Sequence, residues 1–252
     1  YKNVIDTIKP FENKEINKVN LDKLMLTDNM KDKLLNLKKE DIEVDVINTL
    51  MSISGIGLQK AKALVLMGVK KLADLKKKDI YESLTDETKL HLQYPPKPIP
   101  HKDIKYIDGK LEDAKINYMI TGSYRRNKPV SNDIDIVVEV AHTNKLLMEL
   151  SKLFKTHIYS QGPEHISMIA EAPKYNLRID IFIVEKKYYA AMILYSTGSQ
   201  MHNIHMRSVA KKQGYKLNQI GLYKGDKLIP TTSEEEIFKL LGMPYVVPEK
   251  RI

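Results

Sequence analysis

Two aspartates separated by one residue stand just ahead of an apolar run, and a third interrupts a second apolar run. Asp133 and Asp135 alternate with isoleucine, and Asp180 lies in Leu-Arg-Ile-Asp-Ile-Phe-Ile-Val. Side chains two apart on a strand share a face, so the first two carboxylates would point the same way. If the second strand lies alongside, three carboxylates converge and repel one another unless a cation compensates them. Such oxygen ligands suit Mg²⁺, which predicts a two-metal site.

A glycine–serine turn precedes this acidic strand by about ten residues, in the run Thr121-Gly122-Ser123-Tyr124-Arg125-Arg126. Glycine lets the backbone approach a ligand closely, and a helix starting at Ser123 would present free N–H groups to phosphate. Arg126 can add bidentate hydrogen bonds. A lone turn is usually only a turn, and a lone aspartate usually ends a strand at the surface. Together, the turn and the spaced aspartates would supply a phosphate-binding site and a metal-binding site, the two sites that nucleotidyl transfer requires.

The elements that must position these residues are strands and helices of the back half of the chain. Alternating or continuous apolar patterns predict strands over Tyr118 to Thr121, Asp133 to Val140 and Leu177 to Val184, with a helix over Thr143 to Phe154. The back half is therefore α/β or α+β. Before it, Tyr94 to Pro100 contains four prolines, cannot be helical and is the best candidate linker.

The front half has helical spacing of its apolar residues. We expect two short helices within residues 1–48 and two more within residues 46–78, the latter separated by the Gly55-Ile56-Gly57 turn. Gly68 is expected to end the second of these, ahead of a short helix from Leu72 to Leu75.

Composition narrows the class of partner. The chain has 252 residues, 42% of them apolar, and 41 Lys and Arg against 32 Asp and Glu give a net charge of +9. A polyanion is therefore the first partner to consider, with an ordinary basic protein as the alternative. The absence of cysteine excludes disulfides and thiolate metal sites. No apolar run is long enough to span a membrane and no signal peptide is evident, so we expect no membrane partner and an intracellular protein, in the nucleus or cytoplasm or at a viral replication site.

These residues resemble the nucleotidyltransferase superfamily, and a further segment narrows the resemblance to family X of the DNA polymerases, the polymerase beta-like enzymes. Tyr195-Ser196-Thr197-Gly198-Ser199, followed by Asn203 and Arg207, is similar to the family's Tyr-Phe-Thr-Gly-Ser, Asn and Arg run. The turn Ile53 to Gly57 resembles the family's helix-hairpin-helix, and the segments Tyr215 to Gln219 and Pro248 to Arg251 resemble a compact viral member. The resemblance covers residues 46–252.

The resemblance implies an α+β fold in four parts. A reduced, lyase-like helical region (1–44) and a helix-hairpin-helix DNA-binding subdomain (45–98) would precede a nucleotidyltransferase palm with a mixed β-sheet (99–186). A small α/β subdomain that binds the nascent base pair (187–252) would follow. The implied activity is short-gap-filling repair synthesis, as in base-excision repair, by two-metal transfer to a primer 3′-hydroxyl. Template-independent terminal transfer and a catalytically inactive DNA-end-binding scaffold remain alternatives.

Roles for individual residues follow from the same resemblance. Two Mg²⁺ ions, or Mn²⁺ in their place, would be bound by Asp133 and Asp135, and the catalytic one also by Asp180. The incoming dNTP would contact Gly122, Ser123, Arg126, Asn132, Tyr195, Ser196, Gly198 and Asn203, with the Gly198–Ser199 peptide expected to be cis. Gapped or nicked duplex DNA would contact Gly55, Gly57, Lys60 and Arg207.

Two further expectations concern the front half. Carbonyls of Met51, Ile53 and Ile56 would hold Na⁺ or K⁺ at the hairpin turn. Lys33 falls near the family's 5′-deoxyribose phosphate lyase nucleophile, but its segment lacks the glycines of that site, so a scaffolding helix is the favoured alternative. A DNA ligase and an AP endonuclease are the implied protein partners of a monomer.

Overall fold

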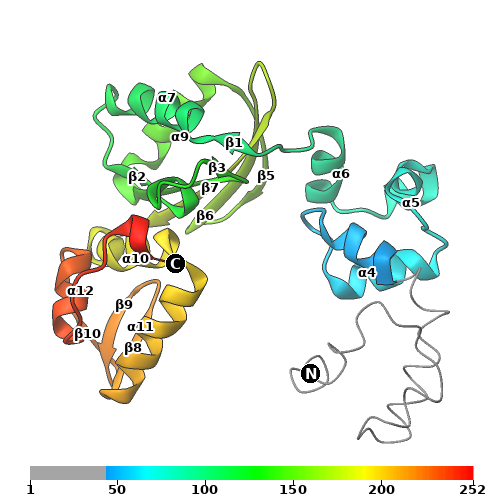
Figure 1. The fold of residues 1–252 in the computed structure, drawn as a ribbon. Helices are drawn as coiled ribbons and strands as arrows, with labels where there is room; N and C mark the ends of the chain where they lie inside the picture. The colour runs from blue at the N-terminus through cyan, green and yellow to red at the C-terminus, as the bar shows by residue number, and fades with distance from the viewer. Residues whose placement is uncertain (1–43, 252) are drawn as a thin grey trace, which may run out of the picture. The chain divides into compact units, whose positions relative to one another are not determined.

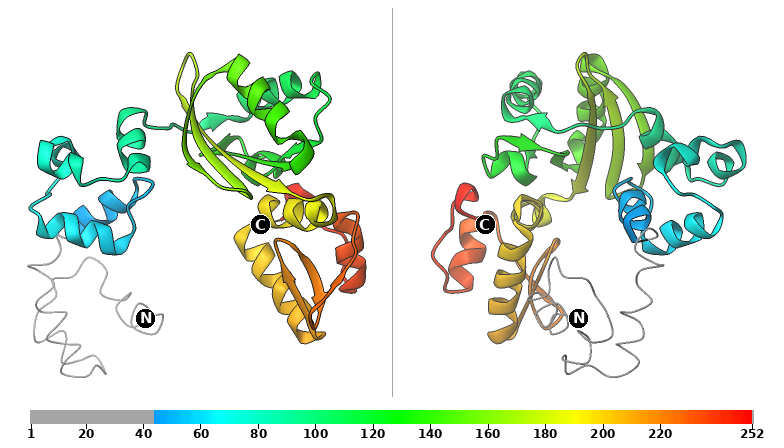
Figure 2. Two further views of the ribbon diagram at one scale, coloured as in Figure 1. Left: turned by 180° about the vertical axis from the view of Figure 1, so that it is seen from behind. Right: turned by 45° about the vertical axis from the view of Figure 1, so that its right-hand side comes forward.

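The computed structural model describes residues 44–251, and its contacts divide the chain into two compact units, residues 1–88 and 89–252. Figure 1 shows the fold and Figure 2 gives two further views. The helices predicted before residue 44, and Lys33 with them, lie outside the described residues. Within the described part, every helix is too short or too polar to span a bilayer. The predicted boundaries of four parts stay predictions.

The first unit is helical in all its regular elements among the described residues. A helix through residues 44–51 is followed by α4 (Leu58–Leu66), the 3₁₀ helix η2 (Leu72–Lys76), α5 (Lys78–Glu82) and the start of α6 (Asp86–Gln93). Gly55 and Gly68 have positive φ angles of 81° and 88°, which allow the chain to reverse before and after α4. The predicted helix–turn–helix, the stop at Gly68 and the short helix after it are confirmed.

A small apolar core explains why the first unit folds in this way. Ala61 and Leu64 lie three residues apart on one face of α4, and both are buried. Leu50 from the preceding helix and Ile56 from the turn are also buried. The turn is therefore held by its own isoleucine as well as by the conformational freedom of its glycine.

The second unit contains a five-stranded mixed sheet in the order β2-β4-β7-β6-β5. Its strands are β2 (Tyr118–Ile120), β4 (Ile134–Glu139), β5 (Lys155–Gln161), β6 (His165–Glu171) and β7 (Asn176–Val184). The central pair β4 and β7 is parallel, and the other pairings are antiparallel. The three predicted strands and the mixed α+β character are thereby confirmed, and the predicted helix is α9 (Thr143–Leu153).

The two faces of this sheet have different coverings. Ile134, Ile136 and Val138 of β4 belong to a core shared with α7 (His101–Glu112) and α9, which lie on the same side of the sheet in Figure 2. The alternate residues of β4 face the other side, where Val137 packs with Met192 of α10 (Tyr189–Thr197). Because Asp135 has the same parity as Val137, the acidic residues lie on the face opposite α7 and α9.

The segment predicted as a linker, Tyr94 to Pro100, is paired with other parts of the second unit. Tyr94 to Pro100 contains no helix after Gln93, as predicted, but Ile99 and Pro100 form β1, which pairs with β3 (Val130–Ser131). Pro96 bridges to Asn176, and Ile99 is fully buried. The interpretation of this stretch as a linker is therefore wrong in one respect: the prolines prevent helix formation, yet they leave the edge positions of a short strand pair available.

The C-terminal part builds a second core beside α10. It contains α11 (Gln200–Lys212), the three-stranded antiparallel sheet β8 (Tyr215–Asn218), β9 (Gly221–Lys224) and β10 (Lys227–Ile229), then α12 (Glu234–Leu240) and the 3₁₀ helix η5 (Pro248–Lys250). Leu194, Met206, Leu222 and Phe238 bring α10, α11, β9 and α12 together in one buried cluster. The predicted small α/β character of this part is confirmed.

Candidate active site

The three predicted aspartates lie together on one face of the central strand pair. Asp135 of β4 is the direct register partner of Asp180 of β7, and Asp133 precedes β4 with the same parity. Burial, together with the neighbouring Asp133 and Asp180, raises the pKa of Asp135 to about 7. Burial also raises the pKa of Asp133. Carboxylates packed this closely are fully ionised at neutral pH only when positive charge nearby stabilises them.

Asp180 is held by its own surroundings. The Ser167 hydroxyl donates to its Oδ1 at 2.5 Å, and Arg178 Nε lies 2.9 Å from its Oδ2. Among residues 44–251, no three His, Asp or Glu side chains are placed so that they could hold a metal ion as they stand. The carboxylates are therefore assembled on one face, and the Asp180 carboxylate is held by Ser167 and Arg178.

The glycine–serine turn packs directly against the acidic strand. Gly122 has φ of +59°, and a Cβ at this position would collide with Asp135 Oδ2. Ser123 donates to Ser131 Oγ at 2.7 Å. The turn continues into the four-residue helix α8 (Gly122–Arg125). Glycine is thus required here by both the backbone conformation and the close approach of the carboxylate.

Arg126 is held by the C-terminal part of the chain. Its Nη1 donates to the carbonyl of Thr197 at 2.5 Å, while its Nε is buried without a hydrogen-bond partner among the described residues. Burial lowers the pKa of its guanidinium, against the attraction of Asp135. A buried donor that lacks a partner is costly, so an anionic ligand at this position would be stabilised.

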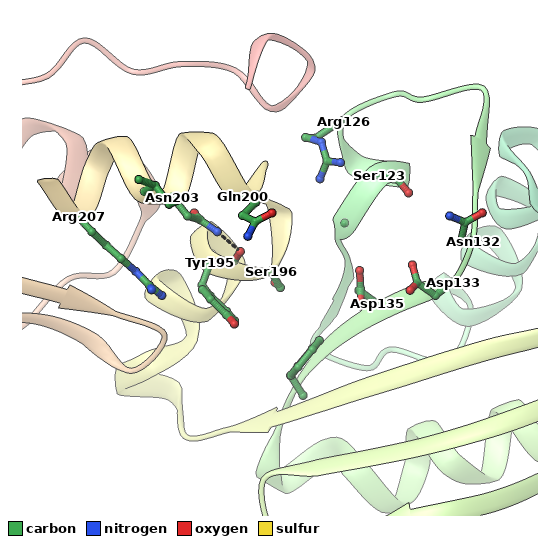
Figure 3. A pocket seen from close by; sticks show the side chains of 14 residues that line it. Ser123, Arg126, Asn132, Asp133, Asp135, Tyr195, Ser196, Gln200, Asn203 and Arg207 are labelled. Carbon is green, nitrogen blue, oxygen red and sulfur yellow. Dashed lines mark hydrogen bonds between the residues drawn. The ribbon is translucent and has the colours of Figure 1, made fainter. Parts of the chain in front are cut away.

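These groups line one open cleft with a volume of about 680 Å³. Figure 3 shows Ser123, Arg126, Asn132, Asp133 and Asp135 on one side of the cleft and Tyr195, Gln200, Asn203 and Arg207 on the other. The cleft brings together all eight predicted nucleotide-binding residues, two of the three aspartates and Arg207. Its lining is Gly122, Ser123, Arg126, Asn132, Asp133, Asp135, Phe182, Tyr195, Ser196, Gly198, Gln200, Asn203, Ile204 and Arg207.

Three lining residues, Phe182, Gln200 and Ile204, were not among the predicted site residues. Phe182 follows Asp180 by two residues on β7 and so faces the same side of the sheet, a period-two signal that could have revealed it. Ile204 neighbours Asn203 on α11 and is 51% exposed. An exposed isoleucine beside polar contact residues carries no sequence signal of its own.

The far side of the cleft is built where α10 meets α11. The peptide bond between Gly198 and Ser199 is cis, as predicted. Asn203 donates from Nδ2 to the Tyr195 carbonyl at 2.7 Å, and the Arg207 guanidinium lies 5.4 Å from the Tyr195 ring centroid. These contacts fix the relative positions of the two helix ends.

A largely buried ion triad joins the glycine–serine turn to the C-terminal part of the chain. Arg125 donates to Thr197 Oγ1 at 2.7 Å and to Glu234 Oε2 at 2.6 Å. Arg251, whose side chain is 0% exposed, donates to Glu234 Oε1 at 2.6 Å. Burial alone would raise the pKa of Glu234, but the two arginines hold it below its usual range. The triad cannot be recognised from the sequence because its members are far apart along the chain.

The predicted DNA-contact residues of the first unit lie around its hairpin turn. Gly57 is the N-cap residue of α4, and Gly55 adopts a left-handed conformation beside Thr88. Lys60 Nζ is turned back onto the turn, 3.3 Å from the Gly55 carbonyl and 3.2 Å from Thr85 Oγ1.

The carbonyls predicted to hold a monovalent ion lie in the same turn. The Ile53 carbonyl accepts a hydrogen bond from the Ile56 backbone N–H at 3.1 Å, while Met51 is partly exposed. Carbonyl oxygen has two lone pairs, so the Ile53 hydrogen bond leaves room for a cation.

Known proteins resemble this chain over most of its length. A family model described as the DNA polymerase beta thumb matches residues 192–252. The chain is 34% identical over 144 residues to Repair DNA polymerase X of African swine fever virus (isolate Warthog/Namibia/Wart80/1980), covering 54% of this chain and 82% of the viral protein. It is 27% identical to DNA polymerase lambda of Arabidopsis thaliana, covering 84% of this chain and 47% of the plant protein.

Solved structures show the same resemblance. The polymerase beta of Leishmania infantum in a ternary P/T complex superimposes with a TM-score of 0.73 and 27% identity, covering 84% of this chain and 99% of that one. The same enzyme in a ternary gap complex gives a TM-score of 0.74 at 26% identity, covering 83% and 90%.

Proposed function

Because the chain belongs to family X of the DNA polymerases and is a DNA-directed DNA polymerase, we propose that it fills short gaps in duplex DNA during repair. The observation that carries this proposal is the register pairing of Asp135 with Asp180 on the open face of the palm, opposite the helix ends that carry Tyr195 and Asn203. The Leishmania relative was solved in a ternary gap complex, which supports a gap as the substrate.

The triphosphate of a dNTP fits the side of the cleft that carries Ser123 and Arg126. The Arg126 guanidinium offers a buried Nε donor, and Gly122 lets the backbone come close. Across the cleft, Tyr195, Ser196 and Gly198 would contact the sugar and base, and Asn203 would reach the edge of the incoming base. Arg207 would contact the template strand. The distribution of these side chains on two opposing walls would hold the α-phosphate near the aspartates.

The aspartates fit a pair of divalent cations by their chemistry. They offer hard oxygen donors on one face, and the pKa of Asp135, raised by burial and by its acidic neighbours, indicates an uncompensated negative charge. Two Mg²⁺ ions, or Mn²⁺, would be held by Asp133 and Asp135, one of them also by Asp180. When bound, such ions lower the pKa of a primer hydroxyl and neutralise charge at the phosphate. Asp180 would exchange part of its present contact with Arg178 for this role.

The DNA duplex would also be held by the first unit. The turn around Gly55 and Gly57 would contact the phosphate backbone without reading sequence, with Lys60 nearby and Na⁺ or K⁺ on the carbonyls of Met51, Ile53 and Ile56. Replacing K⁺ by tetramethylammonium at constant ionic strength should then weaken DNA binding, and unchanged affinity would remove the cation from the proposal. Filling a gap leaves a nick, so a DNA ligase would act next, after an AP endonuclease that opens the strand.

A lyase activity of Lys33 is a separate proposal that rests on sequence position alone, because Lys33 lies outside the described residues. Borohydride trapping of a 5′-deoxyribose phosphate end on wild type and Lys33→Ala tests it. Equal trapping by both proteins would clear Lys33 of that role.

The decisive experiment measures incorporation of one dNTP into a one-nucleotide gap in the presence of Mg²⁺. Wild type should extend the primer, Asp180→Ala should lose at least about a hundredfold in rate, and Asp226→Ala, an exposed aspartate far along the chain, should match wild type. Equal extension of a lone single strand would instead favour terminal transfer. Absence of Mg²⁺-dependent incorporation would contradict the proposal and favour an inactive DNA-end-binding scaffold.

A further inference from the structure

Ser167 is a polar residue in a strand that is otherwise built for burial. β6 reads His-Ile-Ser-Met-Ile-Ala-Glu, and its residues from Ile166 to Ala170 are all buried. Ile166, Met168 and Ala170 pack into the core under α7 and α9, so Ser167 faces the opposite side, where the aspartates lie. Burying a hydroxyl is costly unless it is hydrogen-bonded, so this serine needs a reason to be there.

The partner of Ser167 is Asp180. The two residues are direct register partners across the antiparallel pair β6 and β7, and Ser167 Oγ donates to Asp180 Oδ1 at 2.5 Å. Both are almost fully buried, at 4% and 5% exposure. A hydrogen bond from a hydroxyl to a carboxylate is short and strong, and both ends here belong to inner strands of the sheet.

The other contacts of Asp180 come from more exposed side chains. Arg178 approaches Oδ2 with a side chain that is 35% exposed, and His165 Nε2 lies 3.4 Å from Oδ1 with a side chain that is 39% exposed. Ser167 is the most buried of the three partners, and its position is set by the register of two inner strands. Ser167 is therefore the contact that fixes the direction of the Asp180 carboxylate.

We infer that Ser167 is a positioning residue for the polymerase reaction. By holding Oδ1 of Asp180, Ser167 orients the carboxylate so that Oδ2 faces a divalent cation shared with Asp133 and Asp135. This inference rests on the proposed role of Asp180 as the third carboxylate ligand. Hydrogen-bond partners behind metal-binding side chains typically govern affinity and activity by tenfold to a hundredfold. Removing one hydroxyl should therefore weaken the site while the nucleotide contacts of Ser123 and Arg126 remain.

The test compares Ser167→Ala with Ser167→Thr, which restores a hydroxyl, and with Ser151→Ala as a matched control. Ser151 lies exposed on α9, where its hydroxyl bonds only to the Met148 carbonyl. One readout is gap filling, with kcat, the KM for dNTP and the half-saturating Mg²⁺ concentration. The second is Mn²⁺ binding, measured by electron paramagnetic resonance on the enzyme with dNTP and gapped DNA whose primer ends in a dideoxynucleotide, so that no turnover occurs.

Ser167→Ala should lower kcat about tenfold and should weaken, also about tenfold, the binding of the Mn²⁺ ion that Asp180 would hold. The KM for dNTP should stay within about twofold of the wild-type value, and the Tm should stay close to it. Ser167→Thr should recover most of both losses, and Ser151→Ala should behave as wild type. Ser167→Ala with normal kcat and normal Mn²⁺ binding would overturn the inference. A loss accompanied by a lower Tm and not recovered by threonine would also overturn it, because the serine would then only pack the strand.

Asp180→Ala separates this inference from the proposed function. If Asp180→Ala loses both the second Mn²⁺ ion and incorporation while Ser167→Ala loses neither, the inference fails and the proposed function stands. If Asp180→Ala retains normal incorporation and both ions, the proposed role of Asp180 fails, and the inference about Ser167 fails with it.

Discussion

Gly122 shows at the scale of a residue how closely the glycine–serine turn and the acidic strand are packed. Its φ of +59° is one that L side chains rarely adopt, and the space where a Cβ would stand is occupied by the Asp135 carboxylate. Asp135 cannot retreat easily, because it sits on an inner strand beside Asp180. Any side chain at position 122 must therefore displace a predicted metal ligand.

We predict that Gly122→Ala lowers gap-filling incorporation by about a hundredfold, the loss expected when a reacting group is misplaced by about 1 Å. Gly109→Ala is the matched control, because Gly109 lies inside α7 with open space around a Cβ. That change should leave incorporation intact and stabilise the fold by about 0.5–1 kcal/mol. Steady-state incorporation and urea unfolding of both variants check the prediction, and full activity of Gly122→Ala would contradict it.

The aspartates can be predicted from the sequence at this scale because their spacing matches the period of a strand. Asp133 and Asp135 share a face by parity alone, and Asp180 stands out as the single acid in an apolar run. Arg178 shares the face of Asp180 by the same parity, whereas Ser167 cannot be recognised in this way as its partner. Ser167 reaches that carboxylate only through the register of β6 against β7, and no local pattern encodes that pairing.

At the scale of an element, α11 combines a cleft-facing side with a buried side that carries His202. The His202 ring stacks on Phe238 of α12 at 5.7 Å. Burial lowers its pKa to about 4, with help from the positive charges of Arg251 and His205 and against the attraction of Glu234. In the folded chain the imidazole is therefore neutral over the whole physiological pH range. At acid pH the buried ring must either take up a proton in place or lose its packing against α12.

The sign of the resulting pH dependence follows from the depressed pKa. Between pH 6.5 and about 4 the unfolded chain binds the His202 proton and the folded chain does not, so stability is present above pH 6.5 and is lost as the pH falls. His202 alone should reduce the free energy of unfolding by about 2 kcal/mol between pH 7 and pH 5. Urea unfolding at pH 7, 6 and 5 measures this loss.

His202→Phe should remove that share of the pH dependence, whereas His205→Gln, which changes an exposed histidine on the same helix, should keep it. Identical pH slopes for wild type and His202→Phe would refute the assignment of this loss to His202.

The long apolar runs of β4 and β7 were predicted as strands, whereas β5 and β6 were not predicted. β4 and β7 carry buried residues along most of their length, and their predicted bounds match the structure within two residues. The strand β5 escaped prediction because all its residues, from Lys155 to Gln161, are exposed or only partly buried. Its partner β6 supplies the apolar residues for both, so only their pairing reveals the hairpin.

At the scale of the whole molecule, charge is the property most visible in the sequence. The net charge of +9 predicts a polyanionic partner, and the relatives are DNA polymerases. The boundaries between the predicted parts cannot be read from composition, since the proline-rich stretch that marks a linker is fastened to the palm by β1. The boundary between the two compact units instead falls between Thr88 and Lys89, within α6.

We predict that binding to a one-nucleotide-gapped duplex weakens several hundredfold between 50 and 200 mM salt, as expected if about five phosphates are neutralised. Fluorescence anisotropy with a labelled duplex at several salt concentrations measures the slope. Urea unfolding at the same two salt concentrations is the control that separates weaker binding from loss of fold. A salt-independent affinity would show that basic side chains do not neutralise the DNA backbone.

Arg125 and Arg126 are neighbours in sequence and both donate to Thr197, but their other surroundings differ. Arg125 uses two different nitrogens for Thr197 and Glu234, which the single ammonium of a lysine could not reproduce, whereas Arg126 faces the cleft. When variants or orthologues are compared, a lysine at the first position would report on how the C-terminal part docks. The same change at the second would report on what the cleft accepts. If the two arginines were treated as one basic motif, the effect on docking of the C-terminal part could not be told from the effect on ligand binding in the cleft.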